Sequence, residues 1–100
     1  MELEVRDGRV EVALPAVIDL PAAADLRDTL LDALARDSGG DVVLKADGVE
    51  RISTAAVQVV LAAASSFRAA ARRIEVAGAT PPVTEAFRLL GLGAELDLVS

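Results

Sequence analysis

The sequence contains neither cysteine nor histidine, and its only aromatic residues are two phenylalanines. The missing cysteines exclude disulfides and thiolate metal sites. The missing histidines remove the commonest general base, the commonest metal ligand and any histidine phospho-relay. Because so little remains to carry catalysis, we expect a protein that is not an enzyme and that uses no metal and no cofactor.

Positive charge is also scarce, with 10 lysines and arginines against 16 acidic residues and a net charge of −6. Such a surface repels the backbone of nucleic acids and anionic lipids, so neither is an expected partner. No apolar stretch approaches the ~18 uninterrupted residues of a membrane span, and charges at Glu2, Glu4 and Arg6 exclude the apolar core of a signal peptide. We therefore expect a cytoplasmic protein without direct membrane insertion, and 100 residues predict one domain over 1–100.

The opening residues predict a β-hairpin. Apolar and charged side chains alternate over residues 3–6 and again over 9–14, which is typical of half-buried strands. Between them stands Asp7-Gly8, a dipeptide that accepts the positive φ angles of a tight turn.

The rest of the chain alternates between strand and helix patterns. Leu26, Leu30, Leu31 and Leu34 form one stripe of a helix that begins near Pro21 and ends at Ser38-Gly39-Gly40. A second helix runs from Ser53-Thr54 to about Arg73, where Arg72-Arg73 complement its negative end, and a third is capped by Thr80 and stops at Gly91. Short strands are expected at residues 41–45, 74–77 and 96–99. The pattern predicts an α/β (α+β) fold with a mixed central sheet of about four to six strands, packed against helices and opening with a β-hairpin.

Ser53 and Thr54 stand where a loop meets the second helix. One interpretation is that a hydroxyl caps the helix by accepting a hydrogen bond from a free N–H of its first turn. The other is phosphorylation, because the positive end of a helix tolerates a phosphate that adds about two negative charges. The interpretations are compatible, since one hydroxyl can cap the helix while the other accepts phosphate.

Three other sequence patterns do not predict a metal, phosphate or catalytic site. Asp25, Asp28 and Asp32 share a helix face, but their spacing matches no calcium loop, so we interpret them as a solvated face. Gly91-Leu92-Gly93 follows a helix instead of preceding one, which indicates a helix stop and not a phosphate loop. The helix that follows Ser53-Thr54 has more apolar residues than one core-facing stripe requires. Val59 and Ala62 are therefore predicted to form an exposed apolar strip beside Ser53-Thr54.

Residues 49–61, Val-Glu-Arg-Ile-Ser-Thr-Ala-Ala-Val-Gln-Val-Val-Leu, resemble the signature region of STAS domains. This family is named after sulfate transporters and anti-sigma-factor antagonists. Ser53 holds the family's aspartate position, Thr54 its phosphoacceptor position, and the alanines at 55 and 56 its small positions. Residues 16–19 look like the family's Gly-Glu-Leu-Asp, with Asp19 matching an acidic residue near the partner-binding surface. Residues 80–92 are similar to its Ser-Pro-x-Val helix and Gly-Leu ending.

The resemblance implies a protein–protein switch of the anti-sigma-factor-antagonist kind, which binds a serine-kinase-type partner and is controlled by phosphorylation at Thr54, with Ser53 as the other candidate acceptor. The alternative is a non-phosphorylated scaffold or subunit of a chemotaxis or lipid-transport assembly. A small-molecule binder or an enzyme on this fold is a third hypothesis, which the missing histidine and cysteine disfavour. We expect a monomer or a weak dimer. The expected partner-binding surface consists of Asp19, Ser53, Thr54, Ala55, Ala56, Gln58 and Val59.

Overall fold

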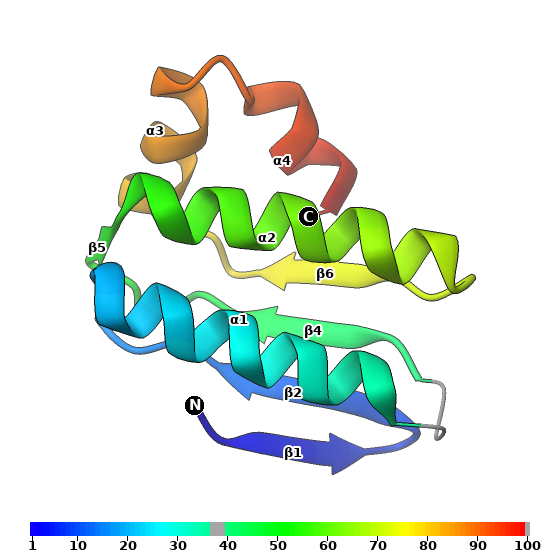
Figure 1. Ribbon diagram of the computed structural model, residues 1–100. Helices are drawn as coiled ribbons and strands as arrows, with labels where there is room; N and C mark the ends of the chain where they lie inside the picture. Colours follow the sequence, from blue (N-terminus) through cyan, green and yellow to red (C-terminus); the bar gives the residue numbers. More distant parts are fainter. Residues whose placement is uncertain (37–39, 100) are drawn as a thin grey trace.

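A four-stranded mixed sheet forms one layer of the molecule, and the computed structural model describes residues 1–36 and 40–99 (Figure 1). The strand order is β1-β2-β4-β6, with β1 antiparallel to β2 and the other neighbours parallel. The strands of this sheet are β1 (Leu3–Arg6), β2 (Arg9–Ala13), β4 (Val42–Lys45) and β6 (Ile74–Ala77). The helices are α1 (Leu20–Ala35), α2 (Thr54–Ala69), α3 (Pro81–Leu89) and α4 (Gly93–Val99). The short strands β3 (Val17–Ile18) and β5 (Arg51–Ile52) pair in parallel as a separate sheet.

The predicted hairpin is confirmed. Asp7 and Gly8 connect β1 to β2 with φ angles of 50° and 76°, as a tight turn between twisted strands requires. The hairpin places Leu3 opposite Val12 and Val5 opposite Val10, so both strands direct their apolar side chains to the same face of the sheet.

Helices α1 and α2 lie side by side over that face, and the core lies between the two layers (Figure 1). Alternation along the strands decides which side chains enter the core. In the register shared by β2, β4 and β6, Val12, Leu44 and Val76 are buried, whereas Glu11 and Glu75 flank a half-buried Val43. The sheet is therefore apolar on one face and mixed on the other. The central position predicted for residues 41–45 is confirmed, because β4 lies between β2 and β6.

The stripe predicted for the first helix is narrower than expected. Leu26 and Leu30 are fully buried and Leu34 is half-buried, but Leu31 is 52% exposed. A helix turns by about 100° per residue, so a leucine five positions after Leu26 points away from the core that Leu26 enters. The helix ends at Ala35, and the stop predicted at Ser38 and Gly39 lies outside the described residues.

Helix α2 ends at Ala69, earlier than the predicted Arg73. The N–H of Ala71 donates to the carbonyl of Arg68, and the N–H of Arg72 donates to that of Phe67. These two bonds form a Schellman motif, in which the residue after the cap adopts a left-handed conformation. Ala71 does so with a φ of 58°, and the chain turns back toward α1.

Arg72 uses this turn to reach the C-terminal end of α1. Its side chain donates to the carbonyls of Ala33, Leu34 and Gly40 at 3.0–3.1 Å, and its guanidinium lies 4.8 Å from the centre of the Phe67 ring. The expectation that Arg72 complements the end of its own helix is therefore wrong. The helix stops before Arg72, and two of the carbonyls that Arg72 contacts, those of Ala33 and Leu34, belong to the last turn of the neighbouring helix.

The strand predicted at residues 96–99 is wrong, because this segment is the helix α4. Leu92, Leu96 and Val99 are spaced four and three residues apart, which places all three on one helical face. Leu96 and Val99 are buried on that face, where α4 packs against α3 and β6. The short alternation of apolar and acidic residues after Glu95 is consistent with both structures, and packing favours the helix.

Helix α3 begins at the predicted position, but Thr80 does not cap it with its side chain. Its hydroxyl donates instead to the carbonyl of Val49 at 2.7 Å, which ties the start of α3 to the loop before β5. The predicted stop at Gly91 is confirmed by its φ of 73° and by the Schellman bond from the N–H of Leu92 to the carbonyl of Phe87.

Candidate functional site

Helices α1 and α2 begin next to each other. In the small parallel sheet Ile18 lies opposite Ile52, and the N–H of Ser53 donates to the carbonyl of Ile18 at 2.8 Å. Asp19 and Ser53 directly follow these paired strands and are the N-cap residues of α1 and α2. The pairing of β3 with β5 thus brings together two residues that are 34 positions apart in the sequence.

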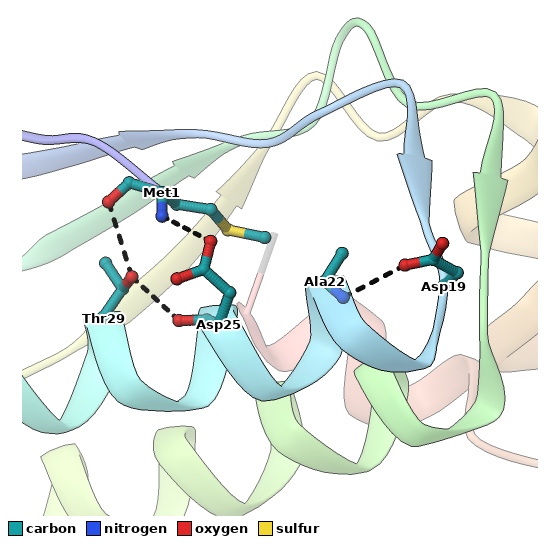
Figure 2. A network of polar contacts seen from close by, with 5 residues as sticks. All are labelled: Met1, Asp19, Ala22, Asp25 and Thr29. Atoms are coloured by element: carbon teal, nitrogen blue, oxygen red, sulfur yellow. Dashed lines mark hydrogen bonds and ion pairs between the residues drawn. The ribbon is translucent and has the colours of Figure 1, made fainter.

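Each N-cap satisfies a free N–H of its own helix. An Asp19 carboxylate oxygen accepts a hydrogen bond from the N–H of Ala22 at 3.0 Å (Figure 2). The Ser53 hydroxyl accepts one from the N–H of Ala56 at 3.2 Å. Both caps have the extended backbone that favours this geometry. The predicted role of a hydroxyl as the cap is confirmed for Ser53.

Thr54 is the first residue of α2 and is exposed. Because Ser53 caps the helix, the Thr54 hydroxyl is not needed for this task. The neighbouring α1 end already carries the negative charge of Asp19, whereas the cap of α2 is a neutral hydroxyl. A negative group added at Thr54 would therefore lie at a positive helix end that no capping carboxylate neutralises.

The other residues of the predicted partner-binding surface differ in accessibility. Gln58 is exposed, Ala55 and Val59 are half-buried, and Ala62 of the predicted apolar strip is exposed. Ala56, also named for this surface, is fully buried, so its side chain is not accessible in this structure. It lies on the core face of α2 with Val57 and Val60, and only its N–H takes part in the cap.

A polar network holds the first residue of the chain against α1, as Figure 2 shows. The amino group of Met1 contacts a carboxylate oxygen of Asp25 at 2.6 Å. The Thr29 hydroxyl lies 2.9 Å from the Asp25 carbonyl and 3.5 Å from the Met1 carbonyl. Asp25 therefore contacts the start of the chain. Among the acidic side chains that the structure describes, no three gather in a way that could hold a metal ion.

The family model described as "Mlab, STAS domain" matches residues 1–100. The chain belongs to the STAS domain family. The comparison with curated proteins found no match for this STAS domain. In the part of the chain that the structure describes, no helix combines the length and the apolar character needed to span a membrane.

Several solved structures share the fold of this STAS domain. The anti-sigma factor antagonist SpoIIAA in its unphosphorylated form superposes with a TM-score of 0.80 at 21% identity, over 93% of this chain and 82% of that one. A putative anti-sigma factor antagonist from Thermotoga maritima gives 0.78 at 16% identity, over 93% and 80%. A structure described as Mglu gives 0.66 at 28% identity, and there the match covers 76% of this chain but only 19% of the other.

The fold predicted from the sequence is confirmed by these neighbours. The positions that the resemblance singled out, Asp19 and Ser53-Thr54, lie together at one end of the α1–α2 pair. The contact between Arg72 and α1 was not predicted from the sequence. The best signal would have been an arginine directly after an alanine-rich helix end, which by itself does not identify the helix that it contacts.

Proposed function

We propose that this STAS domain is a regulatory protein-binding module whose kinase-type partner docks on the paired N-termini of α1 and α2, and that phosphorylation of Thr54 releases the partner. The observation that carries the proposal is that only one of two adjacent hydroxyls is used as the helix cap. Ser53 caps α2, and Thr54 stands exposed beside it. The module acts in the cytoplasm, as one domain over residues 1–100.

The chemistry of the site supports a switch that leaves the fold intact. A phosphate on Thr54 would add about −1.5 to −2 charges at the positive end of α2, where such charge is favourable. The same charges would face a bound partner, next to the carboxylate of Asp19. Like charges brought together in an interface cost several kcal/mol, so the phosphate acts on binding and not on folding.

A second function is favoured by a specific observation. The matching family model is described as "Mlab", and Ser53 stands where the family pattern has an aspartate before the acceptor. In this alternative the same surface makes a constant contact in a transport or chemotaxis assembly, and Thr54 is never phosphorylated. Both functions place the partner on one surface, so the experiment has to separate contact from modification.

The change to test is Thr54→Glu, which places a permanent negative charge on the exposed first residue of α2. We expect the circular dichroism spectrum to stay unchanged and capture of the partner from native lysate to fall by about tenfold or more, because the added charge repels the docked surface. Thr84→Glu is the matched control, since Thr84 is an exposed threonine near the start of another helix, α3.

Mass spectrometry of the protein from its native cells then separates the two functions. Phosphate on Thr54, together with weaker capture by Thr54→Glu, supports the switch. Weaker capture with no phosphate under any growth condition supports the constant contact. If Thr54→Glu and Thr84→Glu capture the partner equally well, Thr54 lies outside the interface and both functions are wrong.

A further inference from the structure

A groove of about 510 Å³ runs between α1 and α2, away from the two N-caps. Its walls are apolar and include Leu31 and Leu34 from α1 and Val59 and Ala62 from α2, with Phe67 at one end. Leu31, which points away from the core, is half exposed in this groove. The polar residues of the lining are Arg27, Gln58 and Ser66.

The parallel arrangement of the helices places the two long polar side chains, Arg27 and Gln58, at one end of the groove, and Ser66 and Phe67 at the other. The N-caps Asp19 and Ser53 lie at the same height along the two helix axes. A rise of 1.5 Å per residue then places Gln58 about 8 Å and Arg27 about 12 Å from the N-caps along these axes. By the same rise Phe67 and Leu34 lie about 21–22 Å along. The amide and the guanidinium therefore share the end nearest the N-caps, and the groove continues from them for roughly two helical turns.

The size of the groove favours a small ligand over a protein. Binding sites for small molecules have volumes of about 300–1,000 Å³ and combine apolar walls with a few polar groups. A stable protein interface uses about 20–30 residues on each side, whereas ten residues line this groove.

The charge of the polar end favours an anionic headgroup. Arg27 has Asp28 as a partner at 3.9 Å, and both side chains are more than half exposed, so this pair is weak. Its planar guanidinium is suited to bind a carboxylate through two parallel hydrogen bonds. The Gln58 amide supplies a further N–H donor at the same end.

We propose that the groove binds a free fatty acid, with its carboxylate on Arg27 and Gln58 and its acyl chain along Leu31, Val59 and Ala62 toward Phe67. This site shares Gln58 and Val59 with the predicted partner surface. It does not depend on the proposed function, because its test measures ligand binding to the chain alone.

Isothermal titration calorimetry of the full chain with dodecanoate, below its micellar concentration, tests the proposal. We expect saturable binding of one molecule per chain. Decanoate should bind about fifteenfold more weakly if its two missing methylenes are fully buried, since each contributes about fourfold. Dodecyltrimethylammonium should bind more weakly than dodecanoate. Non-specific binding to a chain of net charge −6 would favour the cationic amphiphile instead.

Matched variants locate the bound molecule. Leu31→Gln should weaken dodecanoate binding about tenfold, whereas Leu89→Gln, which changes an exposed leucine on α3, should leave it unchanged. Arg27→Gln should weaken dodecanoate binding but not that of dodecyltrimethylammonium, and Arg68→Gln should affect neither. Both leucines are largely exposed, so the fold is expected to survive each change.

Three outcomes would overturn the proposal. One is the absence of saturable binding at one molecule per chain. Another is equal loss of binding in Leu31→Gln and Leu89→Gln. The third is a dimer in sedimentation analysis that Leu31→Gln converts to a monomer, because the groove would then belong to a second copy of the chain.

Discussion

Ala71 adopts a backbone conformation that alanine rarely takes, and it does so where α2 reverses into β6. Its φ of 58° is left-handed, which costs a residue with a Cβ about 1–2 kcal/mol relative to glycine. Helix α3 ends in the same motif, but there the left-handed residue is Gly91. The two helix ends thus differ in how well their residue suits the turn.

Ala71→Gly is therefore expected to stabilise the protein. Removing the left-handed penalty and subtracting the added flexibility of the unfolded chain leaves a gain of about 0.5–1 kcal/mol. Urea unfolding measures the change. Ala70→Gly is the control, because Ala70 has a φ of −93° and gains nothing from glycine. A loss of stability in Ala71→Gly similar to that in Ala70→Gly would contradict the argument.

Outside the apolar core, replacing Arg72 should lower the free energy of unfolding more than replacing any other residue. Arg72→Gln removes most of its hydrogen bonds to the carbonyls of Ala33, Leu34 and Gly40, of which the Ala33 carbonyl also accepts from the N–H of Arg36. We expect a loss of about 2–4 kcal/mol in the free energy of unfolding, measured in urea. Arg73→Gln changes an exposed neighbour and should cost less than about 0.5 kcal/mol. Equal losses would show that the hydrogen bonds from Arg72 to the end of α1 do not contribute to the stability of the fold.

Among the elements, α3 carries a charged pair with a defined pH dependence. The hydrogen bond from Arg88 lowers the pKa of Glu85 below its usual value, and the two side chains lie three residues apart on the helix at 3.0 Å from Nε to Oε2. The folded pKa lies below the unfolded one. The contribution of the pair is therefore present above the unfolded pKa and is lost as the pH falls through the folded value.

Arg88→Gln should raise the pKa of Glu85 back toward its ordinary value, because the variant removes both the charged donor and the positive charge. NMR titration of the Glu85 side-chain carboxyl measures this shift. Arg68→Gln removes an arginine from a different helix and should leave the titration unchanged. An unaltered Glu85 titration in Arg88→Gln would assign the lowered pKa to another cause.

Elements could be predicted from the sequence where local chemistry decides them. Asp7-Gly8 specifies its turn, and Gly91 specifies a helix end, whatever surrounds them. The segment at α4 has no such local determinant, because alternation suggests a strand whereas the spacing of Leu92, Leu96 and Val99 suits a helix. Contact with α3 and β6 decides between them, and a local pattern does not contain that contact.

At the scale of the whole molecule, the candidate site depends on contacts between distant parts of the chain. The sequence placed Ser53 at the start of one helix and Asp19 shortly before another, and only the resemblance to STAS domains suggested a shared surface. The pairing of Ile18 with Ile52 brings them together, and Arg72 fixes the opposite end of the helix pair. The groove was not predicted as a whole, because its two walls come from helices that are separated by β4 and β5 in the sequence.

The two-layer arrangement also predicts which half of the hairpin holds the fold together. Val5 and Val10 lie opposite each other on one face, yet Val5 is 53% exposed and Val10 is 1% exposed. Val10→Ala should therefore lower the free energy of unfolding by about 1.5–3 kcal/mol, whereas Val5→Ala should cost well under 1 kcal/mol. Urea unfolding of the two variants makes the comparison within one cross-strand pair. Equal losses would mean that the outer strand is covered in solution, and sedimentation analysis would then show whether a second copy of the chain covers it.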